Sequence, residues 1–121
     1  MGPMGRMERM LDAASQARLI ESSRPYRQDP PGAKEAVLLL HGFTGQPYEL
    51  RSIADALAGS GYAVMGPRYP GHGSRRADFM TTRAEDWLRR ALDSWLELRA
   101  DYGTVHLVGH SMGGLIAASL A

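Results

Sequence analysis

Residues 105–114 have the sequence VHLVGHSMGG, and this stretch decides how the rest of the chain is interpreted. Its aliphatic half predicts a strand over residues 104–108, and the small residues from Gly113 to Ala121 predict a helix. Gly109 to Gly113 between them fits the pattern G-x-S-x-G, which in a strand–turn–helix context holds the serine in a strained turn with its hydroxyl exposed. Side chains at Gly109 and Gly113 would collide with the neighbouring strand and helix. The alternative interpretation is a glycine-rich turn with an incidental Ser111.

A second segment, residues 36–45 with the sequence AVLLLHGFTG, supports the first independently. Ala36 to Leu40 is aliphatic without polar alternation, which is typical of a strand buried on both faces. Gly42 and Phe43 follow in a loop, and we expect the backbone N–H groups of Phe43 and Met112 to converge on one point. Two such donors would form an oxyanion hole, each stabilising a developing oxyanion by about 3 kcal/mol. Met112 also begins the last predicted helix, whose positive end favours the same charge.

The remaining segments alternate between strands and helices. Helical spacing of apolar residues predicts helices over 47–59 and 82–101, and a strand is expected over 62–65, a loop over 66–81 and a short edge strand over 24–28. Thr82 and Glu85 have the spacing of a capping box at the start of the second helix. Buried strands that alternate with helices predict an α/β fold, in which a parallel sheet is covered by helices on both faces.

Composition excludes several classes of protein. A length of 121 residues allows one domain, and the longest apolar run, Ala36–Leu40, is far shorter than the roughly 20 residues that a bilayer requires. Fourteen basic and thirteen acidic residues give a net charge of +1, so no nucleic-acid or anionic-membrane partner is expected. The chain has no cysteine, which excludes disulfides, thiolate metal sites and a cysteine nucleophile.

Residues 1–23 are interpreted as an amino-terminal extension that precedes the domain at 24–121. Arg6 and Arg9 are not followed by the apolar stretch of about 7–15 residues that a secretory signal needs, so a cytoplasmic location is expected. Apolar residues within 7–14 form a helix-like stripe. Two interpretations stay open for this stripe: a helix that docks on a membrane surface or lid, and a loosely ordered extension.

The chain resembles the amino-terminal half of an α/β-hydrolase, most closely the bacterial carboxylesterase and monoacylglycerol-lipase branch. The matching motifs, in order, are AVLLLHGFTG (36–45), PRYPGHG (67–73), DW (86–87) and VHLVGHSMGG (105–114). This resemblance implies a hydrolase of small carboxylic esters that forms an acyl-enzyme at Ser111 and requires no cofactor and no metal. It also implies that His41 supports the oxyanion loop from behind and that His72 belongs to a structural loop.

The other two histidines are judged from their positions. His106 lies inside a predicted strand and is expected to be a core or face residue. His110 is adjacent to Ser111 but should point away from it in this kind of turn, and a role in lining the pocket stays open.

A serine hydroxyl needs a base to remove its proton, and in α/β-hydrolases an acid and then a histidine follow the serine. Residues 112–121 contain neither. We therefore expect a truncated fold whose 121 residues alone are poorly soluble, oligomeric or partly folded and lack esterase activity. Three hypotheses stay open: an esterase whose remaining catalytic residues are encoded elsewhere, an inactive remnant that binds an acyl ligand or a partner, and an assembly unit that self-associates through an exposed sheet edge.

Overall fold

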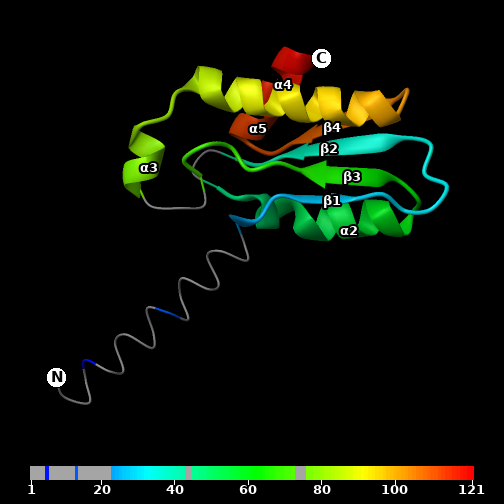
Figure 1. Cartoon of the computed structure of the whole chain (residues 1–121), viewed down its shortest axis with the longest axis horizontal. Helices are drawn as coiled ribbons and strands as arrows, with labels where there is room; N and C mark the ends of the chain where they lie inside the picture. Colours follow the sequence, from blue (N-terminus) through cyan, green and yellow to red (C-terminus); the bar gives the residue numbers. More distant parts are fainter. Residues whose placement is uncertain (1–4, 6–12, 14–22, 43–44, 73–75) are drawn as a thin grey trace.

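Four strands form a single mixed sheet in the order β1-β3-β2-β4 (Figure 1). The computed structural model describes residues 5, 13, 23–42, 45–72 and 76–121. Strands β2 and β3 are parallel, as are β2 and β4, whereas β1 is antiparallel to β3. The predicted parallel arrangement of three strands and the predicted short edge strand are therefore confirmed. The strands are β1 (Tyr26–Gln28), β2 (Ala36–Leu40), β3 (Ala63–Gly66) and β4 (Val105–Gly109).

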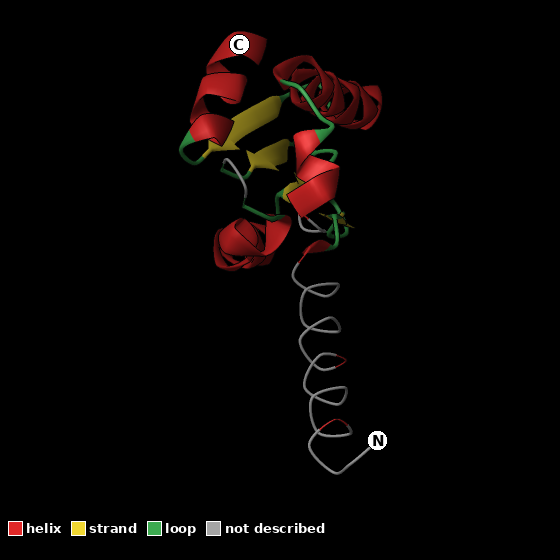
Figure 2. Ribbon diagram, turned by 90° about the vertical axis from the view of Figure 1, so that its left-hand side faces the viewer, coloured by secondary structure: helices red, strands yellow, loops and turns green. Residues whose placement is uncertain are grey.

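Strand β2 lies inside the sheet because it has no polar face. All five of its residues are buried. Leu38 and Leu40 face the layer formed by helices α4 (Ala84–Asp101) and α5 (Met112–Leu120). Val37 and Leu39 face the 3₁₀ helix η1 (Pro47–Leu50) and helix α2 (Arg51–Gly59), which continue one into the other. Figure 2 shows the sheet between these two layers of helices, as predicted.

The start of α4 differs from the prediction. Arg83 is the N-cap, and its backbone N–H donates to Asp86 Oδ2 at 2.9 Å, so the capping box predicted from Thr82 and Glu85 is wrong. The Thr82 hydroxyl is already engaged, because it donates to the Phe79 carbonyl at 2.8 Å and accepts the Trp87 indole N–H at 3.1 Å. Phe79 belongs to the short helix α3 (Arg76–Met80), which occupies part of the predicted loop.

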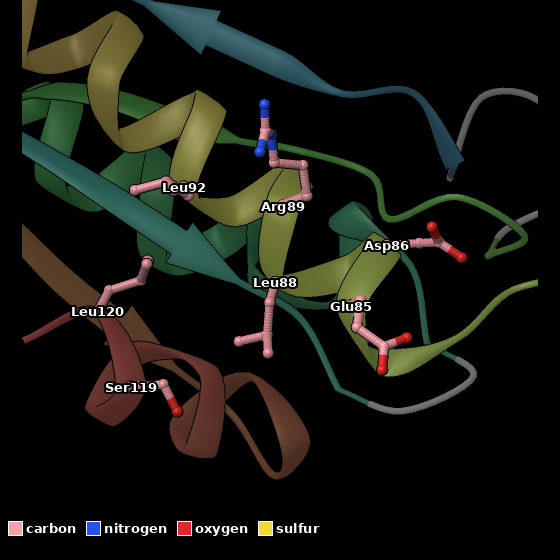
Figure 3. Close-up of a pocket in the computed structure, with 7 residues that line it drawn as sticks. All are labelled: Glu85, Asp86, Leu88, Arg89, Leu92, Ser119 and Leu120. Carbon is pink, nitrogen blue, oxygen red and sulfur yellow. The ribbon is translucent and has the colours of Figure 1, made fainter.

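The helices bury narrower faces than their apolar periodicity suggests. Helix α4 buries Trp87, Ala91, Ser94 and Leu98, whereas Leu88, Leu92 and Leu96 are 36–51% exposed. In α5, Ile116 is buried, whereas Leu115 is 72% exposed. The physical reason is that Ile116 already occupies the turn of α5 that faces the sheet, which leaves its neighbour on the outer side. A groove of about 600 Å³ runs between α4 and α5, lined in part by Leu88, Leu92 and Leu120 (Figure 3).

Two further predictions concern the margins of the molecule. Most of the extension at residues 1–23, including its apolar stripe, lies outside the described residues. Within the described part of the chain, β4 is paired with β2 on one side only, so the expected exposed sheet edge is present. Self-association through that edge stays a prediction. No helix in the described ranges is both long enough and apolar enough to cross a membrane.

Candidate active site

Ser111 lies in a tight turn between β4 and α5. Its backbone has φ 57° and ψ −121°, and it is the one non-glycine residue with a positive φ among those the structure describes. The Gly113 N–H donates to the His110 carbonyl at 2.9 Å and closes the turn around Ser111. A positive φ is unfavourable for a residue with a Cβ, and such conformations occur disproportionately at functional sites. The strained turn predicted from the sequence is therefore present, and Ser111 is exposed.

The two glycines of the motif are required by close backbone contacts. A Cβ on Gly109 would overlap the carbonyl group of Gly113, and a Cβ on Gly113 would overlap the Leu40 carbonyl oxygen. The neighbouring Gly114 has no such constraint, because the nearest atom to its Cβ position would be 3.6 Å away. The expectation that side chains at Gly109 and Gly113 would collide with the strand and helix is confirmed.

The loop after β2 reaches the same place. A Cβ built on Gly42 would lie 3.4 Å from the Ser111 Cβ and 3.4 Å from the His110 carbonyl oxygen, so Gly42 is adjacent to the serine turn. Met112 is the first residue of α5, so its N–H has no acceptor inside the helix. Phe43 lies outside the described residues. The convergence of the Phe43 and Met112 N–H groups thus stays a prediction, supported by the position of Gly42.

His41 supports this loop from within the protein. Its ring is 1% exposed, its Nε2 accepts the Tyr69 N–H at 3.4 Å, and its Nδ1 consequently donates to the Gly42 carbonyl at 3.0 Å. Burial lowers the pKa of His41 to about 4, so the ring is neutral near pH 7. With both ring nitrogens occupied, His41 positions the loop and has no free nitrogen with which to act as a base.

His72 belongs to an aromatic cluster on the same side of the sheet as α4. Its ring centroid lies 5.2 Å from that of Phe79, 5.2 Å from that of Trp87 and 5.4 Å from that of His41. Its Nδ1 is 3.2 Å from the Pro70 carbonyl oxygen, and burial lowers its pKa. These contacts give His72 a structural role, in which the loop that carries it is packed against the loop that follows β2.

The other two histidines are exposed. His106 is a face residue of β4 with a half-exposed side chain, 3.6 Å from Glu35. The His110 side chain is 69% exposed, and its Nδ1 lies 3.7 Å from Glu49 Oε1. Whether His110 lines a substrate pocket stays a prediction. In the described part of the chain no histidine is hydrogen-bonded to the Ser111 hydroxyl.

A family model described as the alpha/beta hydrolase fold matches residues 35–121. The chain belongs to the α/β-hydrolase family. This membership confirms the resemblance that the sequence motifs indicate.

Two relatives of this α/β-hydrolase chain carry the names of a lipase and a carboxylesterase. The chain is 40% identical over 85 residues to the thermostable monoacylglycerol lipase of Bacillus sp. (strain H-257), a match that covers 70% of this chain and 34% of the relative. It is 36% identical over 90 residues to the carboxylesterase of Bacillus subtilis (strain 168), covering 74% and 37%. The chain thus spans little more than a third of the length of these relatives.

A solved structure shows the same fold. It comes from work on LipS and LipT, two metagenome-derived lipolytic enzymes, and superposes with a TM-score of 0.74 at 32% sequence identity. The superposition covers 79% of this α/β-hydrolase chain and 38% of the other.

Sequence reasoning missed one residue at the site. Glu49, in η1, accepts the Gly42 N–H at 2.5 Å through Oε1, and the same oxygen faces His110. Nothing in the motifs pointed to it, because residues 47–50 were interpreted as the start of an ordinary helix. Its nearness to two glycines of the HGFTG segment is a signal that only the fold provides. Within the described ranges, no group of three or more metal-ligating side chains comes together.

Proposed function

We propose that this α/β-hydrolase hydrolyses carboxylic esters and that Ser111 is its nucleophile. The observation that carries the proposal is the backbone of Ser111, which is held at a positive φ between two glycines that tolerate no Cβ. Such a turn keeps a serine hydroxyl exposed at the end of a strand. The names of two relatives, a monoacylglycerol lipase and a carboxylesterase, support an ester as the substrate.

In the proposed reaction the Ser111 Oγ attacks the ester carbonyl carbon while a general base takes the hydroxyl proton. The carbonyl electron pair moves to oxygen, and the oxyanion accepts hydrogen bonds from the Phe43 and Met112 N–H groups. The bond to the alcohol oxygen then breaks, the alcohol takes the proton from the base, and the acyl group stays on Ser111. Water repeats the attack, which releases the carboxylic acid and restores the serine.

The base must be a group that reaches the Ser111 hydroxyl. In this family an acid and a histidine follow the serine, and residues 112–121 include neither. We therefore expect these 121 residues alone to react very slowly, and the complete reaction to need a histidine supplied to this site. This chain would then supply the positioned serine and the stabilisation of the oxyanion, and that histidine would transfer the proton.

A fluorophosphonate probe tests the proposal, because it reacts covalently with an activated serine. In a form of the protein that supplies the histidine, we expect one label, located by peptide mass spectrometry at Ser111. Ser111→Ala should abolish the label and ester hydrolysis, whereas Ser119→Ala, an exposed serine of α5, should leave both unchanged. Retained turnover in Ser111→Ala would contradict the proposal. Binding of an acyl ligand without any labelling would instead favour a non-enzymatic binding protein.

A further inference from the structure

Two glycines that follow β2, Gly42 and Gly45, lie beside the carboxylate of Glu49. The Gly45 N–H donates to the Gly42 carbonyl at 3.0 Å, so the two glycines are close together. The N–H group of Gly42 donates to Glu49 Oε1. A Cβ on Gly45 would lie 2.5 Å from Glu49 Oε2 and 2.9 Å from its Cδ. One carboxylate is thus adjacent to both glycines.

The same carboxylate lies on the side of the loop that faces the serine. The Cβ position of Gly42 is 3.2 Å from Glu49 Oε1 and 3.4 Å from the Ser111 Cβ. His110, which directly follows β4, approaches the same oxygen, and its Nδ1 lies 3.7 Å from Glu49 Oε1. The Glu49 side chain is only 32% exposed, so this contact is partly shielded from water. A hydrogen bond to an ionised carboxylate is stronger than one between neutral groups.

We propose that Glu49 is a positioning residue for the oxyanion loop. By accepting the Gly42 N–H, its carboxylate fixes the peptide that joins His41 to Gly42, and so fixes the start of the loop from which the Phe43 N–H is expected to reach the oxyanion. The inference rests on the proposed function, because it assigns Glu49 to the stabilisation of the Ser111 oxyanion. Glu49 does not touch the reacting atoms, and its effect passes through the backbone of Gly42.

This role makes a specific demand on substitutions. The amide of Glu49→Gln keeps an oxygen that can accept the Gly42 N–H, whereas Glu49→Ala removes the acceptor. The matched control is Glu35→Ala, because Glu35 also faces a histidine at 3.6 Å, but it precedes β2 at the other end of that strand. If activity is lost when the acceptor oxygen is removed in Glu49→Ala but is kept when only the charge is removed in Glu49→Gln, the role of Glu49 is to position the loop. A general effect on stability would not follow this difference between the two variants.

Two measurements test the proposal. In the fluorophosphonate-reactive protein, we expect Glu49→Ala to lower kcat for a nitrophenyl ester about tenfold or more with KM within about threefold, since removal of a full oxyanion donor costs about 10²–10³ in kcat. Glu49→Gln should recover most of kcat, and Glu35→Ala should leave it unchanged. Independently of activity, the amide resonance of Gly42 should shift and its hydrogen exchange should accelerate in Glu49→Ala, but not in Glu35→Ala.

The outcomes distinguish this inference from the proposed function. If Ser111 does not label but the Gly42 amide responds to Glu49→Ala, the proposed function fails and the contact stands. If Ser111 labels while Glu49→Ala keeps kcat and the Gly42 amide unchanged, the positioning role is overturned. A kcat in Glu49→Gln as low as in Glu49→Ala overturns it as well, because the acceptor would then not be what matters.

Discussion

Glycine at position 111 should give a more stable protein than alanine at the same position. Both substitutions remove the hydroxyl, and only alanine keeps a Cβ at φ 57° and ψ −121°. Holding a non-glycine residue in such a region costs about 1–3 kcal/mol. Glycine avoids that cost but loses about 0.5–1 kcal/mol through the greater freedom of the unfolded chain. The net expectation is that Ser111→Gly exceeds Ser111→Ala in free energy of unfolding by about 1 kcal/mol.

The assay is urea unfolding of the two variants side by side, with thermal melting as a second measurement. A difference of this size corresponds to about 4 °C in Tm for a domain of this length. Ala56→Gly is the control, because Ala56 is exposed in the interior of α2, where glycine should be less stable than alanine by about 1 kcal/mol. The two sites should therefore respond with opposite sign. If alanine at position 111 is as stable as glycine, Ser111 is not held under backbone strain in solution.

Two further predictions concern the surroundings of the serine turn. Gly113→Ala should lower the free energy of unfolding by about 3 kcal/mol, because its Cβ would overlap the Leu40 carbonyl. Gly114→Ala, the control, should be neutral or slightly stabilising. Similar urea midpoints for the two variants would contradict the close contact at Gly113. The His41 pKa of about 4 lies below its ordinary 6.5, so the unfolded state binds more protons between these values and stability should fall by about 3 kcal/mol as the pH drops from 6.5 to 4. Unfolding at several pH values checks this, and His41→Gln is expected to reduce the slope of the free energy of unfolding against pH.

The parts of the fold that follow from local patterns were predictable. The aliphatic run Ala36–Leu40 has no polar face, which predicts a strand covered on both sides and is confirmed in β2. The short helix α3 was not predictable, since five residues are too few to show a helical period. The N-cap of α4 was misassigned because the Thr82 hydroxyl fits a cap in sequence but is engaged by Phe79 and Trp87 in space.

The candidate site was predictable only in part. Gly109, Ser111 and Gly113 form a motif of fixed spacing, so the sequence alone predicts the serine turn, although a Cβ on Gly113 would collide with Leu40 of β2 and not with a residue of the turn. Glu49 has no such motif, since its relation to Gly42 depends on how η1 packs beside the loop after β2. Residues at a fixed spacing leave a pattern in the sequence, whereas the contact of Glu49 with Gly42 does not.

The serine turn is completed by contacts with a distant part of the chain. The His110 N–H donates to the Leu40 carbonyl at 3.1 Å, and Gly113 packs against the same carbonyl. These partners are separated by about 70 residues, so the turn depends on a strand pairing that closes a long loop and forms slowly. Until β2 and β4 are paired, the contacts with Leu40 that help to hold Ser111 at its positive φ are missing. A newly made or partly unfolded chain would therefore present Ser111 without its strained backbone, and the proposed nucleophile would take its strained form only after this pairing.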